Sequence, residues 1–240
     1  MSDVNNFDTP ALLAKGAADF IVNLASETIK NRGRFTIALS GGNTPATLYA
    51  LLATIPYSSK INWKKFFVFW GDERCVPAHD KDNNSNNTKK ILLNNVPIPK
   101  ENIFPISVEA PPAKAAAQYE QTIKQFFKTD MPQFDLILLG MGDNGHTASL
   151  FPHTDILKEE KALIKEVFIA GLNMWRITFT AFFINNAKHI LFLVAGKEKK
   201  VMLQTVLQGK YEPEKYPAQL IKNARWFVSI PEKPVSGYKP

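Results

Sequence analysis

Cysteine is almost absent from this sequence, since Cys75 is the only one among 240 residues. A single thiol cannot form an internal disulfide, so the cysteine content gives no sign of an oxidising compartment. No apolar run approaches the roughly 20 residues that span a bilayer. The N-terminal segment has no basic stretch followed by an apolar one, as a secretory signal would. We therefore expect a cytoplasmic protein that does not associate with a membrane.

Dense basic clusters are also missing, although the formal net charge is +7. The nearest approaches to a cluster are Lys64-Lys65, Lys89-Lys90 and residues 197–200. Proteins that bind nucleic acid concentrate positive charge on one face or arm, so we expect no nucleic-acid partner. A diffuse positive charge favours encounter with a small anionic substrate, and it also serves solubility.

Large apolar residues, in contrast, are plentiful. Seventeen phenylalanines and four tryptophans can fill a substantial core. The length suits one α/β domain better than two, and no repeat or linker interrupts the sequence. We expect a single domain over residues 1–240.

Apolar periodicity predicts helices that alternate with short buried strands. The expected helices are residues 10–32, 45–52, 88–94, 111–128 and 197–207. The expected strands are residues 35–39, 65–70, 135–139, 168–170, 176–180, 189–194 and 226–230, and the polar segment 78–87 is expected to be a loop. This order predicts an α/β fold, a Rossmann-like three-layer sandwich in which helices cover both faces of a mostly parallel sheet.

The first expected strand ends in the turn Ser40-Gly41-Gly42-Asn43-Thr44-Pro45. Two glycines allow a backbone to approach an anion closely. Thr44 before Pro45 is typical of a helix N-cap and first turn, and a helix N-terminus binds phosphate. The spacing matches neither a P-loop nor a dinucleotide fingerprint, so a phosphate site and a plain tight turn both remain open.

The second expected strand ends in Gly71-Asp72-Glu73-Arg74. These charges can form an ion-paired loop. Alternatively, Arg74 can bind a phosphate while Asp72 binds sugar hydroxyls or a histidine. We interpret the adjacent Cys75 as a small buried apolar residue, because no histidine base lies clearly nearby.

The third turn runs from Gly140 to Pro152 and contains His146. Three glycines within residues 140–145 place this imidazole on irregular backbone at the edge of the sheet. Its unperturbed pKa of about 6.5 suits proton transfer at neutral pH, so we expect His146 to be a general base. The other histidines, at positions 79, 153 and 189, are weaker candidates.

Two common kinds of catalytic site are not supported. His146, His153, Asp143 and Asp155 do not have the spacing of a zinc motif, so we expect no bound metal. A serine-hydrolase triad is equally unsupported, because Ser40 lacks the Gly-x-Ser-x-Gly context and Ser149 lies only three residues after His146.

Six segments in order resemble the 6-phosphogluconolactonase family, within the larger group that includes glucosamine-6-phosphate deaminases. They are SGGNTP at 40–45, WGDERCVP at 70–77, GMGDNGHTASLFP at 140–152, RITFT at 176–180, FLVAGKEK at 192–199 and PAQLI at 217–221. Any one of them can arise by chance, but their shared order extends the resemblance over most of the chain.

The resemblance implies hydrolysis of 6-phosphoglucono-δ-lactone to 6-phosphogluconate, the second step of the oxidative pentose phosphate pathway, without an organic cofactor. It implies that His146 deprotonates the attacking water, assisted by Asp72 and Arg74. The residues it implies for binding the substrate and its phosphate are Ser40, Gly41, Gly42, Thr44, Arg74, Asn144, Arg176 and Lys197. We expect a monomer or a weak homodimer.

The sequence departs from the family's pattern at two places. Asn144 stands where many relatives have Asp, so that charge is not available to the histidine, although an amide can still orient a water or a substrate hydroxyl. The C-terminal segment 224–240 lacks an acidic residue that often follows the last tryptophan-bearing strand.

Two other functions remain as alternatives to the lactonase. Amino-sugar phosphate deaminases have a pattern similar to Gly-His-Ile-Ala-Phe-Asn-Glu-Pro, whereas this sequence has Gly-His-Thr-Ala-Ser-Leu-Phe-Pro at 145–152. The glutamate is missing here, and Arg176-Ile-Thr is present. A non-catalytic sugar-phosphate sensor is expected to carry a DNA-binding module, and we expect no room for one in this sequence. The histidine of the third turn, His146, is also retained. These features of the sequence favour the lactonase over both alternatives.

Overall fold

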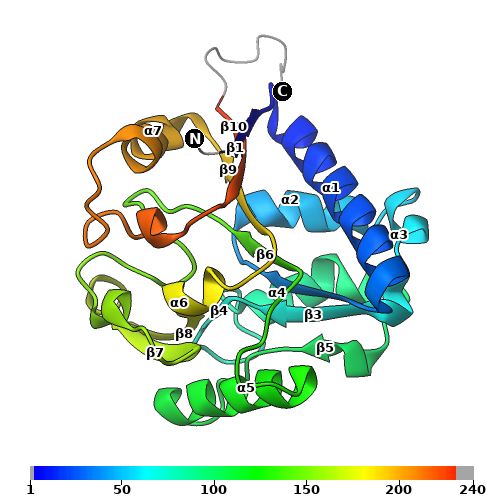
Figure 1. Cartoon of the computed structure of the whole chain (residues 1–240), viewed down its shortest axis with the longest axis horizontal. Coiled ribbons are helices and arrows are strands. Elements are labelled where there is room, and N and C mark those ends of the chain that lie inside the picture. Colours follow the sequence, from blue (N-terminus) through cyan, green and yellow to red (C-terminus); the bar gives the residue numbers. More distant parts are fainter. Residues whose placement is uncertain (1–2, 231–240) are drawn as a thin grey trace.

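A computed structural model describes residues 3–230 of the chain (Figure 1). Its centre is a seven-stranded sheet with the order β1-β10-β9-β6-β2-β3-β5, in which every neighbouring pair is parallel. The strands are β1 (Asp3–Asn6), β2 (Phe35–Leu39), β3 (Phe66–Trp70), β5 (Ile103–Phe104), β6 (Leu136–Leu139), β9 (Ile190–Ala195) and β10 (Arg225–Ser229). The predicted Rossmann-like α/β fold with a mostly parallel sheet is confirmed.

The longer predicted helices are present. They are α1 (Pro10–Arg32), α2 (Asn43–Leu52), α4 (Asn84–Ile91), α5 (Pro112–Phe127) and α7 (Lys200–Gln208), and two short helices, α3 (Tyr57–Lys60) and α6 (Ala181–Ile184), join them. Helix α1 begins after Thr9, whose side chain accepts a hydrogen bond from the Leu12 amide, and ends at Gly33 with φ 78°. Among residues 3–230, no helix combines the length and the apolar character that crossing a membrane requires.

A second, three-stranded sheet was not expected. It is antiparallel, with the order β4 (Asp72–Arg74), β8 (Met174–Phe179) and β7 (Ile164–Ile169). Only Gly71 separates β3 from β4, so the chain leaves the parallel sheet at this residue and enters the antiparallel one at the next. The Gly71 amide donates to the Leu39 carbonyl, and the Gly71 carbonyl accepts from the Phe179 amide, which joins the two sheets there.

Two local predictions were wrong near the first two turns. Thr44 is not the N-cap of α2: the cap is Gly42, with φ 107° and no side-chain hydrogen bond, and Thr44 lies within the first turn. Residues 84–87, expected in a loop, are the start of α4. The Asn83 side chain caps this helix, and the carboxylate of Glu73 accepts hydrogen bonds from its first two amides. The latter is a tertiary contact that local sequence does not reveal.

Other elements begin or end a few residues away from their predicted bounds. The strand expected at 168–170 is longer, at 164–169, and the helix expected from residue 197 begins as a short 3₁₀ turn over 197–199 before α7. Residues 231–240 lie outside the described part of the chain, so the single domain over 1–240 stays a prediction.

Candidate active site

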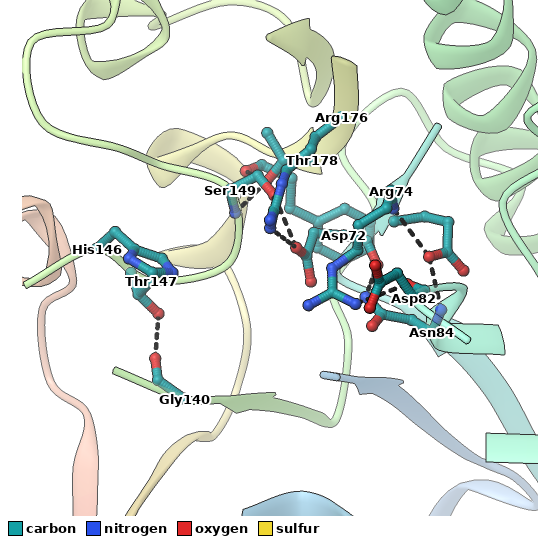
Figure 2. Close-up of polar contacts among 12 residues, drawn as sticks. Asp72, Arg74, Asp82, Asn84, Gly140, His146, Thr147, Ser149, Arg176 and Thr178 are labelled. Carbon is teal, nitrogen blue, oxygen red and sulfur yellow. Dashed lines mark hydrogen bonds and ion pairs between the residues drawn. The ribbon is translucent and has the colours of Figure 1, made fainter. Parts of the chain in front are cut away.

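All three predicted turns meet at one pocket beyond the carboxyl ends of β2, β3 and β6. Its volume is about 360 Å³. Its polar lining comprises Ser40, Gly41, Gly42, Asn43, Thr44, Asp72, Arg74, Asn84, Gly140, Gly142, Asp143, His146, Arg176, Glu198 and Lys199. Figure 2 shows His146 on one side of the group of residues drawn and Arg74, Arg176 and Asp72 on the other.

Two arginines with unused donors line the pocket. In the antiparallel pairing of β4 with β8, Arg74 is the direct partner of Arg176. Arg74 donates from Nη1 to the Asp82 carbonyl at 2.6 Å. The Nε atoms of both arginines and the Oγ of Ser40 are nevertheless buried without a hydrogen-bond partner within residues 3–230. Because buried polar groups are normally paired, three such donors around one pocket indicate an anionic ligand.

A buried network joins the second turn to the third. The Ser149 hydroxyl donates to Oδ2 of Asp72 at 2.7 Å, and the same carboxylate oxygen lies 3.9 Å from Nη1 of Arg176 (Figure 2). The Ser149 amide donates to Oγ1 of Thr178 at 3.1 Å. Burial lowers the pKa of Arg176, as does the charge of Arg74, while Asp72 opposes the shift. Asp72 is therefore placed to hold Arg176 in position as well as to line the pocket.

His146 is held by an aromatic ring and by a glycine. Its imidazole stacks on Phe151, with the ring centroids 4.0 Å apart and an interplanar angle of 14°. The guanidinium of Arg176 lies 5.1 Å from the centroid of the same Phe151 ring. A Cβ at Gly142 would collide with the imidazole, so only glycine leaves room for this ring. His146 and Arg176 thus pack on the same ring.

The tautomer of His146 follows from its contact with Asn144. The Asn144 Oδ1 lies 2.6 Å from the imidazole Nδ1 and accepts a hydrogen bond from the His146 amide at 3.2 Å. The backbone amide can only donate, so the atom facing it must be the oxygen of the Asn144 amide. Nδ1 must then carry the proton, and in the neutral ring Nε2 has the free lone pair that a base requires.

Electrostatics keep His146 neutral. Burial lowers the pKa of the imidazole to about 4, Arg176 and Lys199 act in the same direction, and Asp72 and Asp143 oppose them. An unprotonated imidazole at neutral pH can accept a proton at once. A phosphate bound at Arg176 would offset one of these cations and raise the pKa toward a value better suited to proton transfer.

The two glycines of the first turn, Gly41 and Gly42, are required by close packing and by backbone conformation, respectively. A Cβ at Gly41 would collide with the side-chain amide of Asn84, whose Nδ2 donates to the Asp72 carbonyl at 3.0 Å. Gly42 has φ 107°, which side chains rarely tolerate. The first turn therefore packs directly on the start of α4.

Glu73 stands behind the pocket and was not predicted to have a role. Its carboxylate accepts hydrogen bonds from the amides of Arg74, Asn84 and Ser85 at 2.7–2.8 Å. Burial raises the pKa of Glu73 to about 7, although these three bonds oppose the shift. The contacts fix β4 against the start of α4, and so position Arg74 and Asn84 relative to each other.

Eight of the ten predicted site residues line the pocket: Ser40, Gly41, Gly42, Thr44, Asp72, Arg74, His146 and Arg176. Asn144 is exposed, lies outside this lining and contacts His146 instead. Lys197 is exposed and also lies outside it, whereas Lys199 lines the pocket and forms an ion pair with Asp143 at 2.5 Å.

The residues of the site that were missed include Asn84, Ser149, Phe151 and Lys199. Ser149 and Phe151 lie in the same long turn as His146, where their spacing gave no sign of a role. Asn84 is one of several asparagines in a segment expected to be a loop, and only the three-dimensional structure distinguishes it. Within residues 3–230, no group of His, Cys, Asp and Glu side chains is arranged to hold a metal ion.

Comparison with known proteins places the chain in a family. Residues 8–228 match the family described as glucosamine-6-phosphate isomerases/6-phosphogluconolactonase, and the chain belongs to it. It is 42% identical to a 6-phosphogluconolactonase of Nostoc sp., over 90% of this chain and 88% of the relative. It is 41% identical to a 6-phosphogluconolactonase of Synechocystis sp., over 88% and 87% of the two chains. The solved structure of 6-phosphogluconolactonase from Trypanosoma cruzi superposes with a TM-score of 0.84 at 26% identity, covering 96% of this chain and 95% of that one.

Proposed function

We propose that this protein hydrolyses 6-phospho-D-glucono-1,5-lactone to 6-phospho-D-gluconate, with His146 as the general base. The observation that carries the proposal is one pocket lined by a neutral histidine and by two arginines whose buried Nε atoms have no hydrogen-bond partner among residues 3–230. Relatives more than 40% identical over most of their length, named as 6-phosphogluconolactonases, support the choice of reaction.

The phosphate binds at the first turn in this proposal. The Ser40 hydroxyl, the amides at the start of α2 and the guanidinium groups of Arg74 and Arg176 supply the donors. Because these groups belong to both sheets, the phosphate fixes one end of the substrate firmly. The sugar ring then extends toward His146, and remote binding energy orients the lactone carbonyl.

Hydrolysis follows in two proton transfers. Nε2 of His146 takes a proton from water while the water oxygen bonds to the lactone carbonyl carbon, and the carbonyl oxygen becomes an oxyanion. Lys199, which lines the same pocket and is paired with Asp143, supplies the positive charge that stabilises the oxyanion in this proposal. When the carbonyl re-forms, the bond to the ring oxygen breaks, and the imidazolium returns its proton to this oxygen. The proposal requires neither a metal ion nor an organic cofactor.

A deaminase or isomerase of the same family is the competing function. The alignment of the long turn places Phe151 where the deaminase pattern has a glutamate. In this chain the Phe151 ring covers one face of the imidazole, so an aromatic surface replaces a carboxylate beside the base. This substitution favours lactone hydrolysis over chemistry that needs a second acid-base group there.

The test is an assay in which the lactone is generated in place and its disappearance is followed with and without the protein. We expect decay well above the spontaneous rate and no release of ammonia from glucosamine 6-phosphate. Unchanged lactone decay with a folded protein would contradict the proposal. The cytoplasmic location and the monomeric or weakly dimeric state stay predictions, the latter checked by light scattering.

A further inference from the structure

The Asn144–Gly145 dipeptide lies directly beside the proposed base. Asn144 is exposed, and glycine has no side chain to hinder the attack, but Gly145 itself is buried against Met202 and Tyr216. In such a pair the Gly145 nitrogen can attack the side-chain carbonyl carbon of Asn144. A bond forms between N and Cγ, the Cγ–Nδ2 bond breaks and ammonia leaves. Water then opens the resulting five-membered imide to aspartate or isoaspartate.

The local contacts assist the attack at one atom and restrain it at another. Oδ1 of Asn144 receives two donors from His146, the amide at 3.2 Å and Nδ1 at 2.6 Å, and negative charge develops on this oxygen during the attack. The Gly145 amide, however, donates to the Gly142 carbonyl at 3.1 Å and must give up this bond to react. The reaction therefore depends on local opening of the turn.

We propose that Asn144–Gly145 is a self-modification site, at which deamidation replaces the amide partner of His146 by a carboxylate. The part of this proposal that concerns activity rests on the proposed function, and the chemical part does not.

Each product has its own consequence. Aspartate keeps the backbone length and sets a negative charge against Nδ1–H of His146, where the amide was neutral. The charged groups that now act on this imidazole are Arg176 on β8, Asp72 on β4, Lys199 before α7 and Asp143 in the same turn. The new carboxylate would be nearer than any of them and would favour the protonated ring.

Isoaspartate instead inserts a methylene into the backbone of the turn. The Gly142 amide donates to the His146 carbonyl at 2.9 Å, and the Gly142 Cα packs against the imidazole. A longer chain between these residues cannot keep both contacts. We expect the isoaspartate form to lose most of its activity and the aspartate form to stay active with a changed pH dependence.

The first experiment ages the folded protein in warm, mildly alkaline buffer and maps its peptides by mass spectrometry. We expect the amide-to-acid conversion at Asn144, with both isomers present. Asn84–Ser85 is the internal control, because Asn84 is buried and its amide is bonded to the Asp72 carbonyl. Asn144→Gln is the control variant, since closure of its larger ring is slower. Conversion at Asn144 no faster than at Asn84 would overturn the proposal.

The second experiment separates the charge variants and compares each with Asn144→Asp. We expect the imidazole of the aspartate form, followed by NMR, to titrate about one to two pH units above that of the unmodified chain. The acidic limb of its activity profile should move in the same direction. An unchanged titration would refute the proposed effect on His146. Because NMR needs no turnover, a shifted titration without lactone hydrolysis would count against the proposed function alone.

Discussion

Arg74 lies directly opposite Arg176 in the antiparallel pairing of β4 and β8. Like charges in facing positions of two strands destabilise a sheet. Both side chains also hold a buried Nε without a partner in the described chain. We therefore expect this pair to be unfavourable without a ligand and favourable around an anion such as the proposed substrate phosphate.

The first prediction concerns Arg74→Gln. This variant removes the facing charge, so its free energy of unfolding without ligand should stay within about 1 kcal/mol of the original chain. With 6-phosphogluconate at about 100 times its Kd, the free energy of unfolding of the original chain should rise by about 2.7 kcal/mol, and that of the variant by much less. Denaturant unfolding with and without ligand measures both. Arg34→Gln is the matched control: Arg34 lies against Phe126 and outside the pocket, and this variant should keep the full gain.

The second prediction tests the base. His146→Gln should lower kcat by about 10²–10⁴-fold without unfolding the protein, because the water loses its proton acceptor. His153→Asn provides the control, at the residue directly after this turn. His153 is exposed, has φ 60°, which asparagine tolerates, and lies outside the pocket. If the two variants had similar turnover, His146 would not be the base.

The third prediction concerns pH. In the proposed mechanism the neutral imidazole of His146 is the active form. Its pKa of about 4 in the free protein means that kcat/KM should hold until the pH falls toward that value. With the substrate phosphate bound beside Arg176, protonation of His146 becomes easier, so the limb of kcat should lie at higher pH than that of kcat/KM. Profiles of both constants decide the matter. A limb of kcat/KM at the ordinary histidine value would contradict the effect of burial.

The fourth prediction compares two glycines. Gly41→Ala places a methyl group against the Asn84 amide, so either the turn or α4 must shift, and phosphate binding should weaken at least tenfold, about 1.4 kcal/mol. At Gly171 nothing lies within 4 Å of an added Cβ, so Gly171→Ala should bind as the original chain does. Competition by inorganic phosphate measures both. Equal binding would show that the first turn does not contact the ligand.

The fifth prediction concerns the substrate. Glucono-δ-lactone without its phosphate should turn over about 10²-fold more slowly at saturation, after the spontaneous rate is subtracted, because a misplaced carbonyl is costly. Equal turnover numbers would mean that the phosphate serves capture and not orientation.

The sequence predicted the parallel sheet and the turns that follow β2, β3 and β6, because buried strands and glycine turns leave local patterns. It did not predict the antiparallel sheet. Asp72–Arg74 is short and polar, and its partner β8 lies about a hundred residues later in the chain, so no local pattern connects them. The facing arginines could therefore be seen only in the folded chain.

The sequence also could not show which lysine, Lys197 or Lys199, lines the pocket. Lys197 and Lys199 lie two residues apart in the 3₁₀ turn that follows Gly196, where φ is 114°. Which side chain faces the pocket depends on the direction the backbone takes at this glycine. The resemblance to the family implied Lys197 as a substrate-binding residue, but the residue that lines the pocket is Lys199.

At Gly71 the chain passes from one sheet to the other, and the pocket wall is built from both. Ser40 and His146 follow strands of the parallel sheet, whereas Arg74 and Arg176 belong to the antiparallel one. An anion bound by Ser40 and Arg176 together would link the two sheets and restrain their motion relative to each other. Amide hydrogen exchange along β4 and β8 should slow when it binds, even at residues that never touch it.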